Sequence, residues 1–277
     1  MQPVHRRQAI LRRLSHEGEV SFSALATDYV VSEMTIRRDL EALEASGQAR
    51  RVRGGAISVV SRAYEPPFAM RRITAGAAKT AIGRAAAALV DEGDTIVLDV
   101  GTTTLELARA LRGRRGLTVV TASLQIAVEL GNEIDMRVFV SGGQIRPGEL
   151  SLTGGMAEDA FASVNCDIAF IGVAGVNSDP GLTDYNPEDA RVKRAAIRTA
   201  RRTVVLADNS KFGRVAFSTI TGLSEVDMVV TDAPPAHPVV QEAFAAGVQM
   251  LHAASHNTPA GDGRPSSDDA ESAASGA

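Results

Sequence analysis

Apolar residues in the first part of the chain recur at helical spacing. Ile10 and Leu14 lie on one face of a first amphipathic helix, and Val20 and Phe22 are candidate core anchors before a short second helix. The stretch SEMTIRRDLEALEASG predicts a third helix, with Ser32 as its N-cap. The pattern therefore predicts three consecutive helices.

Beyond the third helix the pattern changes. ARRVRGGAISV alternates around a Gly-Gly turn, which predicts a β-hairpin, and residues 57–75 carry two adjacent prolines and little periodicity, which predicts a linker. Over residues 76–252, helical stretches alternate with β-branched runs, namely TIVLD, LTVVT, RVFVS, DIAFIGV, TVVLAD and DMVVTD. This alternation predicts an α/β domain with a mostly parallel sheet. Residues 253–277 are small, polar and rich in Gly and Pro, and we expect them to be disordered.

Composition and charge agree with two domains in a chain of 277 residues. Residues 1–60 hold nine Arg and seven acidic residues, a net charge of +2, whereas the whole chain is at −4. Any nucleic-acid contact is therefore expected in the N-terminal residues 1–60. Cys166 is the only cysteine, which excludes an intrachain disulfide and indicates a buried apolar residue. Without a bilayer-spanning run or a secretory signal, we expect a cytoplasmic protein that has no membrane partner.

The third helix has two distinct faces. Ile36, Leu40 and Leu43 fall on one side and are expected to pack on a core, while Met34 and Arg38 point the opposite way. An Arg near the start of an exposed helical face suits the DNA major groove, because its guanidinium can bond guanine in bidentate fashion. Together with the short helix before it and the basic hairpin after it, this helix predicts a winged helix-turn-helix in residues 1–56.

Eight residues are candidates for contact with double-stranded DNA. Arg38 is the first choice for a base contact, and the arginines on the helix flank and the hairpin suit phosphate. The alternative is that TIRRDL is an ordinary solvated helix face in which Asp39 pairs with a neighbouring Arg. The candidates are Ser32, Met34, Thr35, Arg37, Arg38, Arg50, Arg51 and Arg53.

The stretch VLDVGTTTLELARAL predicts a strand, a polar loop and the start of a helix. The N–H groups of a first helical turn lack partners and favour an anion, and Gly101 permits close backbone approach. The alternative is a plain turn with a Thr N-cap. Only three of the 29 basic residues are lysines, Lys79, Lys193 and Lys211, and all lie in this larger domain. Their compact ammonium groups suit a small anionic ligand, although chance placement is the competing explanation.

Glycine-rich segments also follow other predicted strands, at the ends where open α/β sheets bind ligands. The sequence shows no Ser–His–Asp grouping, no His/Cys spacing for a metal and no GxxxxGK[ST] motif. We therefore predict no cofactor, no metal site and no catalytic residue.

Motifs in both predicted domains resemble those of one protein family. VSEMTIRRDLEALEASGQARRVRGGA closely resembles the N-terminal signature of the DeoR family of bacterial transcriptional regulators. DVGTTT, SGG, FIGVAGV, GLT and ADNSKFG resemble the motifs of that family's C-terminal sensor domain, in the same order, over about residues 3–252. The resemblance implies a repressor of sugar-utilisation genes whose sensor has a ribose-5-phosphate isomerase-like fold and binds a phosphorylated sugar.

The resemblance also implies a set of effector contacts. One position departs from the family pattern: Ala122 stands in TAS where an amide is frequent, which removes one group that could recognise a hydroxyl or carbonyl. The implied contacts are Arg71, Lys79, Asp99, Gly101, Thr102, Thr103, Gly142, Gly143, Asp208 and Lys211.

The leading hypothesis is a homodimeric or larger DNA-binding repressor whose affinity for DNA depends on a phosphorylated sugar effector. A second hypothesis is a sugar-phosphate isomerase or deaminase with a DNA-binding appendage, in which Asp99, Asp208 and Lys211 would transfer protons. A third is a constitutive DNA-binding protein with a vestigial sensor.

Overall fold

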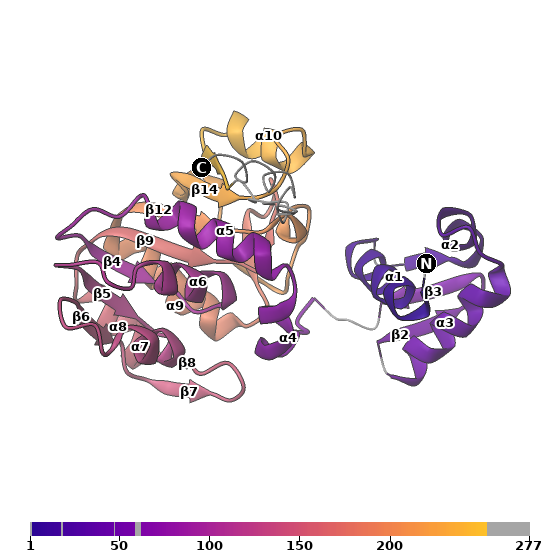
Figure 1. The fold of residues 1–277 in the computed structure, drawn as a ribbon, viewed down its shortest axis with the longest axis horizontal. Coiled ribbons are helices and arrows are strands. Elements are labelled where there is room, and N and C mark those ends of the chain that lie inside the picture. Colours follow the sequence, from indigo (N-terminus) through magenta and orange to yellow (C-terminus); the bar gives the residue numbers. More distant parts are fainter. Residues whose placement is uncertain (1, 18, 47, 59–61, 254–277) are drawn as a thin grey trace, which may run out of the picture.

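The computed structural model describes residues 2–17, 19–46, 48–58 and 62–253, and Figure 1 shows its course. The N-terminal unit has the predicted three helices and hairpin, and its short sheet has the order β1-β3-β2. Both strand pairs in this sheet are antiparallel, so β2 and β3 form the wing. The elements are α1 (Pro3–Glu17), β1 (Glu19–Ser21), α2 (Phe22–Asp28), α3 (Glu33–Ala45), β2 (Ala49–Val52) and β3 (Gly55–Ser58).

The predicted core face of α3 is confirmed. Ile36, Leu40 and Leu43 are buried together with Val20, Phe22 and the apolar face of α1. The Ser32 hydroxyl accepts a hydrogen bond from the Thr35 N–H at 3.2 Å, so it caps the helix as predicted. The stop predicted at Gly47 lies outside the described residues.

The pairing of β3 with β1 depends on Gly55. A Cβ at this position would stand 1.8 Å from the carbonyl oxygen of Val20 in the neighbouring strand β1. No side chain fits there, so this glycine lets β3 lie close against β1.

The larger unit is built on a seven-stranded sheet in which every neighbouring pair is parallel. The strand order is β15-β14-β12-β9-β4-β5-β6, so the chain runs outward from β4 on one side and later outward from β9 on the other. All six predicted strands are present, and β15 was not predicted. The strands are β4 (Thr95–Leu98), β5 (Thr118–Thr121), β6 (Arg137–Val140), β9 (Cys166–Gly172), β12 (Ala200–Leu206), β14 (Met228–Thr231) and β15 (Gln249–His252).

Two apolar cores lie on opposite faces of this sheet. In β4, Ile96 and Leu98 belong to one core and Val97 to the other, as strand alternation requires. Helices α5, α6 and α7 cover the first face, and α8, α9 and α10 cover the second. The helices are α5 (Gly76–Ala87), α6 (Thr102–Ala110), α7 (Leu124–Leu130), α8 (Gly155–Ala162), α9 (Pro187–Thr199) and α10 (Pro238–Ala245).

Smaller elements connect the strands and helices of the larger unit. The predicted linker contains a short helix, α4, that the proline-rich pattern did not indicate. The predicted disordered tail falls almost wholly on residues 254–277, outside the described residues. These elements are α4 (Phe68–Ile73), β7 (Gln144–Arg146), β8 (Ser151–Thr153), β10 (Gly175–Val176), β11 (Leu182–Asp184), η1 (Asn209–Lys211), β13 (Ser218–Thr221) and η2 (Leu223–Glu225).

Candidate functional site

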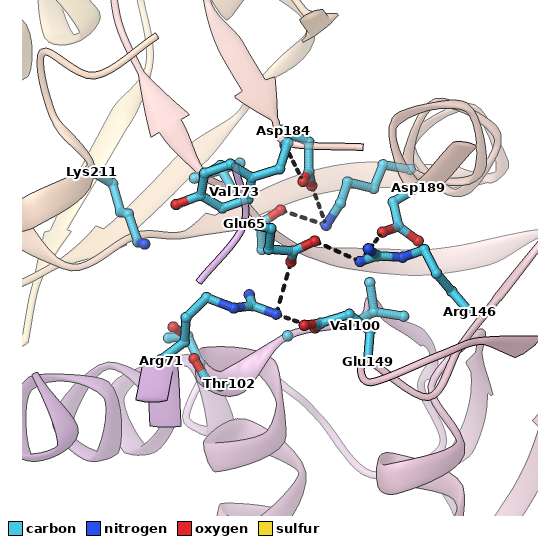
Figure 2. A pocket seen from close by; sticks show the side chains of 16 residues that line it. Glu65, Arg71, Val100, Thr102, Arg146, Glu149, Val173, Asp184, Asp189 and Lys211 are labelled. Atoms are coloured by element: carbon cyan, nitrogen blue, oxygen red, sulfur yellow. Dashed lines mark hydrogen bonds and ion pairs between the residues drawn. The ribbon is translucent and has the colours of Figure 1, made fainter. Parts of the chain in front are cut away.

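A polar pocket opens at the carboxyl ends of β4, β9 and β12. Residues that follow these three strands line it, and β4 and β9 are the neighbours from which the chain runs outward in opposite directions. Such a topological switch point is the usual ligand site of an open parallel sheet. Figure 2 shows the pocket. Its lining comprises Glu65, Arg71, Val100, Gly101, Thr102, Thr103, Arg146, Glu149, Gly172, Val173, Ala174, Asp184, Tyr185, Asp189, Lys193 and Lys211.

The N-terminus of α6 forms one wall of the pocket. Gly101 precedes the helix with φ of 141° and provides no side-chain cap. Thr102 and Thr103 line the pocket, while the Thr104 hydroxyl is used to donate to the Gly101 carbonyl at 2.9 Å. The N–H groups of the first turn have no acceptor within the helix, so this wall can bind an anion.

On the pocket wall, Lys193 is held in a buried ion-pair cluster. Its ammonium contacts the Asp99 carboxylate, lies 3.2 Å from Asp184 and donates to the Gly172 carbonyl at 2.8 Å. Burial lowers the pKa of Lys193, but the surrounding carboxylates of Asp99 and Asp184 outweigh it, and the net pKa is raised. Lys193 therefore stays charged and joins α9 to the ends of β4, β9 and β11.

Two arginines and three carboxylates fill the centre of the pocket (Figure 2). The Glu65 carboxylate lies 2.8 Å from both Arg71 and Arg146. Arg71 also contacts Glu149, and Arg146 lies 2.6 Å from Asp189. Burial raises the pKa of Glu149 to about 7 and that of Asp189 to about 6, although the adjacent arginines act in the opposite direction.

Lys211 differs from these cations. Its side chain points into the pocket in Figure 2, and it forms no hydrogen bond or ion pair with any residue that the structure describes. Burial lowers the pKa of Lys211 to about 8, with Asp208 opposing and nearby arginines adding to the shift. The ammonium is therefore available for a ligand.

Five of the ten effector residues implied by the sequence line this pocket: Arg71, Gly101, Thr102, Thr103 and Lys211. The structure does not place the other five in the lining. Lys79 is buried and donates to the Arg71 carbonyl, so it supports α4 from behind. Asp99 is buried against Lys193, and Asp208 caps η1 by accepting from the Ser210 N–H at 3.0 Å. The remaining two are Gly142 and Gly143.

Gly142 and Gly143 lie where the backbone conformation favours glycine. Both have positive φ, and a Cβ on Gly143 would lie 2.5 Å from the Thr153 carbonyl oxygen. They allow the chain to turn from β6 into the β7–β8 hairpin. Ala122 is buried in the core and is not part of the lining.

Several lining residues were not predicted from the sequence. Lys193 was noted as a rare lysine but was not assigned to the site, and its motif GLTDYNPEDARVK carries Asp184 and Asp189 as well. That clustering was a usable signal. Arg146 and Glu149 lie in VSGGQIRPGELSLTGG, one of the glycine-rich segments that follow predicted strands, but they were not assigned to the site individually. Glu65 lies in the predicted linker, which has no distinguishing pattern. The missed residues are Glu65, Val100, Arg146, Glu149, Gly172, Val173, Ala174, Asp184, Tyr185, Asp189 and Lys193.

On the N-terminal unit, α3 presents a polar face. Met34 and Arg38 are exposed as predicted, and Arg38 forms no ion pair with the described residues. Arg37 packs over the Phe22 ring at 4.1 Å from its centroid and lies 3.8 Å from Glu33. Asp39 points inward and pairs with the buried Arg6 of α1. Asp39, the acidic residue of TIRRDL, therefore stabilises the fold and does not pair with Arg38.

The other DNA candidates have different environments. The Ser32 and Thr35 hydroxyls bond each other at 3.0 Å at the start of α3. Arg51 is tied to α3 through Glu41 at 2.6 Å and Glu44 at 2.7 Å. These ion pairs hold the wing beside the third helix. Arg50 and Arg53 are exposed on the wing and form no ion pair with the described part of the chain.

The described residues provide neither a metal site nor a membrane-spanning helix. Among them, no group of three or more His, Cys, Asp or Glu side chains is placed to hold a metal ion, and none of their helices is long and apolar enough to cross a membrane. Cys166 is buried as predicted, and burial raises the pKa of its thiol to about 11.

Comparisons with known proteins identify both units. Residues 6–62 match the DeoR-like helix-turn-helix domain, and residues 74–233 match the DeoR C terminal sensor domain. The glycerol-3-phosphate regulon repressor of Escherichia coli K12 is 33% identical over 241 residues, which cover 87% of this chain and 95% of the relative. The transcriptional repressor AccR of Agrobacterium fabrum is 35% identical over 82% of this chain and 88% of its own.

Solved structures show weaker similarity. Ribose 5-phosphate isomerase A of Methanocaldococcus jannaschii aligns with a TM-score of 0.37 and 19% identity, over 48% of this chain and 53% of that chain. The delta subunit of eIF2B from Chaetomium thermophilum aligns with a TM-score of 0.42 and 22% identity, over 58% and 57%. Both likenesses are distant.

Proposed function

Because this chain belongs to the DeoR family of transcriptional regulators, we propose that it represses genes of carbohydrate metabolism under the control of a phosphorylated sugar or polyol. It is a regulator rather than an enzyme, as its curated relatives are. The pocket then binds a metabolite, and this binding changes the DNA affinity of the N-terminal unit.

One observation carries the proposed ligand class. The unpaired ammonium of Lys211 and the N-terminus of α6 line the same pocket at the switch point of the sheet. A phosphate group suits this pair, because it accepts hydrogen bonds from backbone N–H groups and from an ammonium together. The carboxylates of Glu149 and Asp189 can accept hydrogen bonds from the hydroxyl groups of a sugar. The name of the Escherichia coli relative, which refers to glycerol 3-phosphate, agrees with a phosphorylated ligand.

The DNA-binding assignment follows from the exposed face of α3. Arg38 would bond a base edge in the major groove, and Arg50 and Arg53 would contact phosphates from the wing. A homodimer or larger homo-oligomer would place two such helices on related half-sites of an operator in the cytoplasm.

Control by the ligand requires two arrangements of the protein. The ligand can change DNA affinity only if it binds the DNA-competent and DNA-incompetent arrangements differently. The family resemblance favours release of DNA when the ligand binds.

The test is calorimetric titration of the full chain with ribose 5-phosphate and glycerol 3-phosphate, each beside its unphosphorylated counterpart. Removing a charged hydrogen bond in Lys211→Ala costs about 1.5–3 kcal/mol, so affinity should fall roughly 10- to 150-fold. Arg201→Ala is the matched control, because this exposed arginine sits at the start of β12, the end of the strand remote from the pocket. A gel shift with the same compounds checks the effect on DNA. If neither these nor other phosphorylated sugars and polyols bind, the sensor role is wrong.

A further inference from the structure

Glu65 reaches the pocket from outside the sensor fold. It lies between the two matched family domains, three residues before α4, yet its carboxylate bridges Arg71 of α4 and Arg146 of β7 at 2.8 Å each. Its side chain is only 13% exposed. A residue of the interdomain segment thus forms part of the ligand pocket.

The bridge neutralises the arginines that an anionic ligand would use. Arg71 already contacts Glu149, and Arg146 already pairs with Asp189, so Glu65 supplies each guanidinium with a second carboxylate. Among the cations that line the pocket in the described structure, only Lys211 keeps an unpaired charge. A ligand phosphate that contacts Lys211 and Arg71 must therefore compete with Glu65.

Glu65 is also the carboxylate best placed to move. Glu149 lies on the β7–β8 turn, where its carbonyl accepts from the Gln125 side chain at 3.1 Å, and Asp189 lies in the first turn of α9. Glu65, by contrast, lies in a segment outside regular secondary structure. Hydrogen bonds near it include those from the Phe217 N–H to the Arg62 carbonyl, from Arg71 Nε to the Pro66 carbonyl and from the Arg71 N–H to the Pro67 carbonyl, each at 3.0 Å.

We infer that Glu65 is an internal counter-anion, and that the phosphate of the effector replaces it at Arg71. Loss of this contact frees the segment that joins the DNA-binding unit to the sensor. The inference rests on the proposed function, because it assumes an anionic ligand in this pocket. Glu65 is then the residue through which ligand binding changes the segment outside the sensor fold.

The first test uses inorganic phosphate as the probe and calorimetry of the full chain. Glu65→Gln keeps the size of the side chain but removes the competing charge, so phosphate should bind about tenfold more tightly. Glu225→Gln is the matched control, because it makes the same change in net charge at an exposed position away from the pocket lining, and its affinity should equal that of the unmodified chain. Unchanged or weaker binding in Glu65→Gln would overturn the inference.

The second test asks whether the segment moves. The chain contains no Trp, and Tyr64 is half exposed beside Glu65, so Tyr64→Trp provides a single fluorescent reporter. Saturating phosphate should shift its emission, and Glu65→Gln in the same background should show most of that shift before phosphate is added. An emission spectrum that phosphate leaves unchanged would show that the segment stays in place and would overturn the inference.

The outcomes separate this inference from the proposed function. If the unmodified chain binds phosphate and Lys211→Ala loses it, but Glu65→Gln gains nothing, the site is correct and the role of Glu65 is wrong. If phosphate binds only in Glu65→Gln, the internal carboxylate excludes it, as inferred. If neither the unmodified chain nor Glu65→Gln binds phosphate or phosphorylated sugars, both proposals fail.

Discussion

The DNA-binding unit and the sensor pocket use arginine in opposite ways. On α3 and the wing, Arg38, Arg50 and Arg53 are exposed and have no ion-pair partner in the described structure. In the pocket, Arg71 and Arg146 are each held by two carboxylates. The DNA-binding unit therefore offers arginines with free positive charge, and the pocket keeps its arginines neutralised.

The difference agrees with the two ligands proposed. DNA is a polyanion that meets many cations at once, so exposed arginines attract it over a wide surface and at little desolvation cost. A small metabolite meets few groups inside a partly buried pocket, where an unpaired guanidinium would be costly. Internal carboxylates stabilise such a pocket when it is empty, and they make ligand binding an exchange of partners.

The largest expected effect is on the free energy of unfolding, and it tests the buried ion pairs of Lys193. Lys193→Met leaves Asp99 and Asp184 buried without their cation, which should lower the free energy of unfolding by about 3–5 kcal/mol. Urea denaturation followed by circular dichroism measures the change. Lys211→Met is the matched control, since this lysine has no partner to lose in the described structure and its removal should cost far less. Equal losses in the two variants would contradict the distinction between paired and unpaired lysines.

The next effect tests the free arginines of the DNA-binding unit. Arg38→Ala should cost about 1–3 kcal/mol on the specific operator and relax the preference for one base, while Arg53→Ala should weaken binding to all sequences alike. Binding to the operator and to base-substituted operators, measured at fixed salt, separates the two results.

Arg51→Ala serves as the comparison within the wing. Its guanidinium is already tied to Glu41 and Glu44, so its loss should weaken DNA binding less than the loss of Arg53. If Arg38→Ala left base preference unchanged, the groove assignment would be wrong.

The smallest effect concerns pH. The lowered pKa of Lys211, about 8, means that its ammonium loses its proton as pH rises through this value. Phosphate affinity should therefore fall above pH of about 8, by at most about tenfold per pH unit, because only the protonated form attracts the anion. A sugar phosphate stays dianionic over this range, since the second pKa of a phosphate monoester is about 6. Calorimetry across pH measures the decline, and Lys211→Arg should remove it. A flat profile in the unmodified chain would exclude Lys211 from the ligand contact.

Much of the fold could be predicted because its signals are local. The buried face of α3 follows from the helical spacing of Ile36, Leu40 and Leu43, and the cap at Ser32 follows from its position before that face. The parallel strands were predicted for the same reason, since each is a short apolar run between helical stretches. The last strand, β15, has the sequence QMLH and only two half-buried apolar residues, so it carried no such signal.

The pocket was predicted only in part. Gly101, Thr102 and Thr103 could be assigned because one loop and one helix start position them together. Gly142 and Gly143 also follow a predicted strand, as Gly101 does, but their positive φ angles show that they form a backbone turn. A glycine-rich motif does not by itself distinguish a ligand contact from a tight turn.

The sequence by itself determined the two kinds of unit, the helix that presents Arg38 and the loop that opens α6, because hydrophobic spacing and capping act within a few residues. Only the tertiary structure decided which charges meet. Lys193 reaches Asp99 across 94 positions, and Arg146 reaches Glu65 across 81, because the strand order brings the ends of β4, β9 and β12 and the interdomain segment to one place. Coulomb attraction depends on distance in space, and distance along the chain does not encode it.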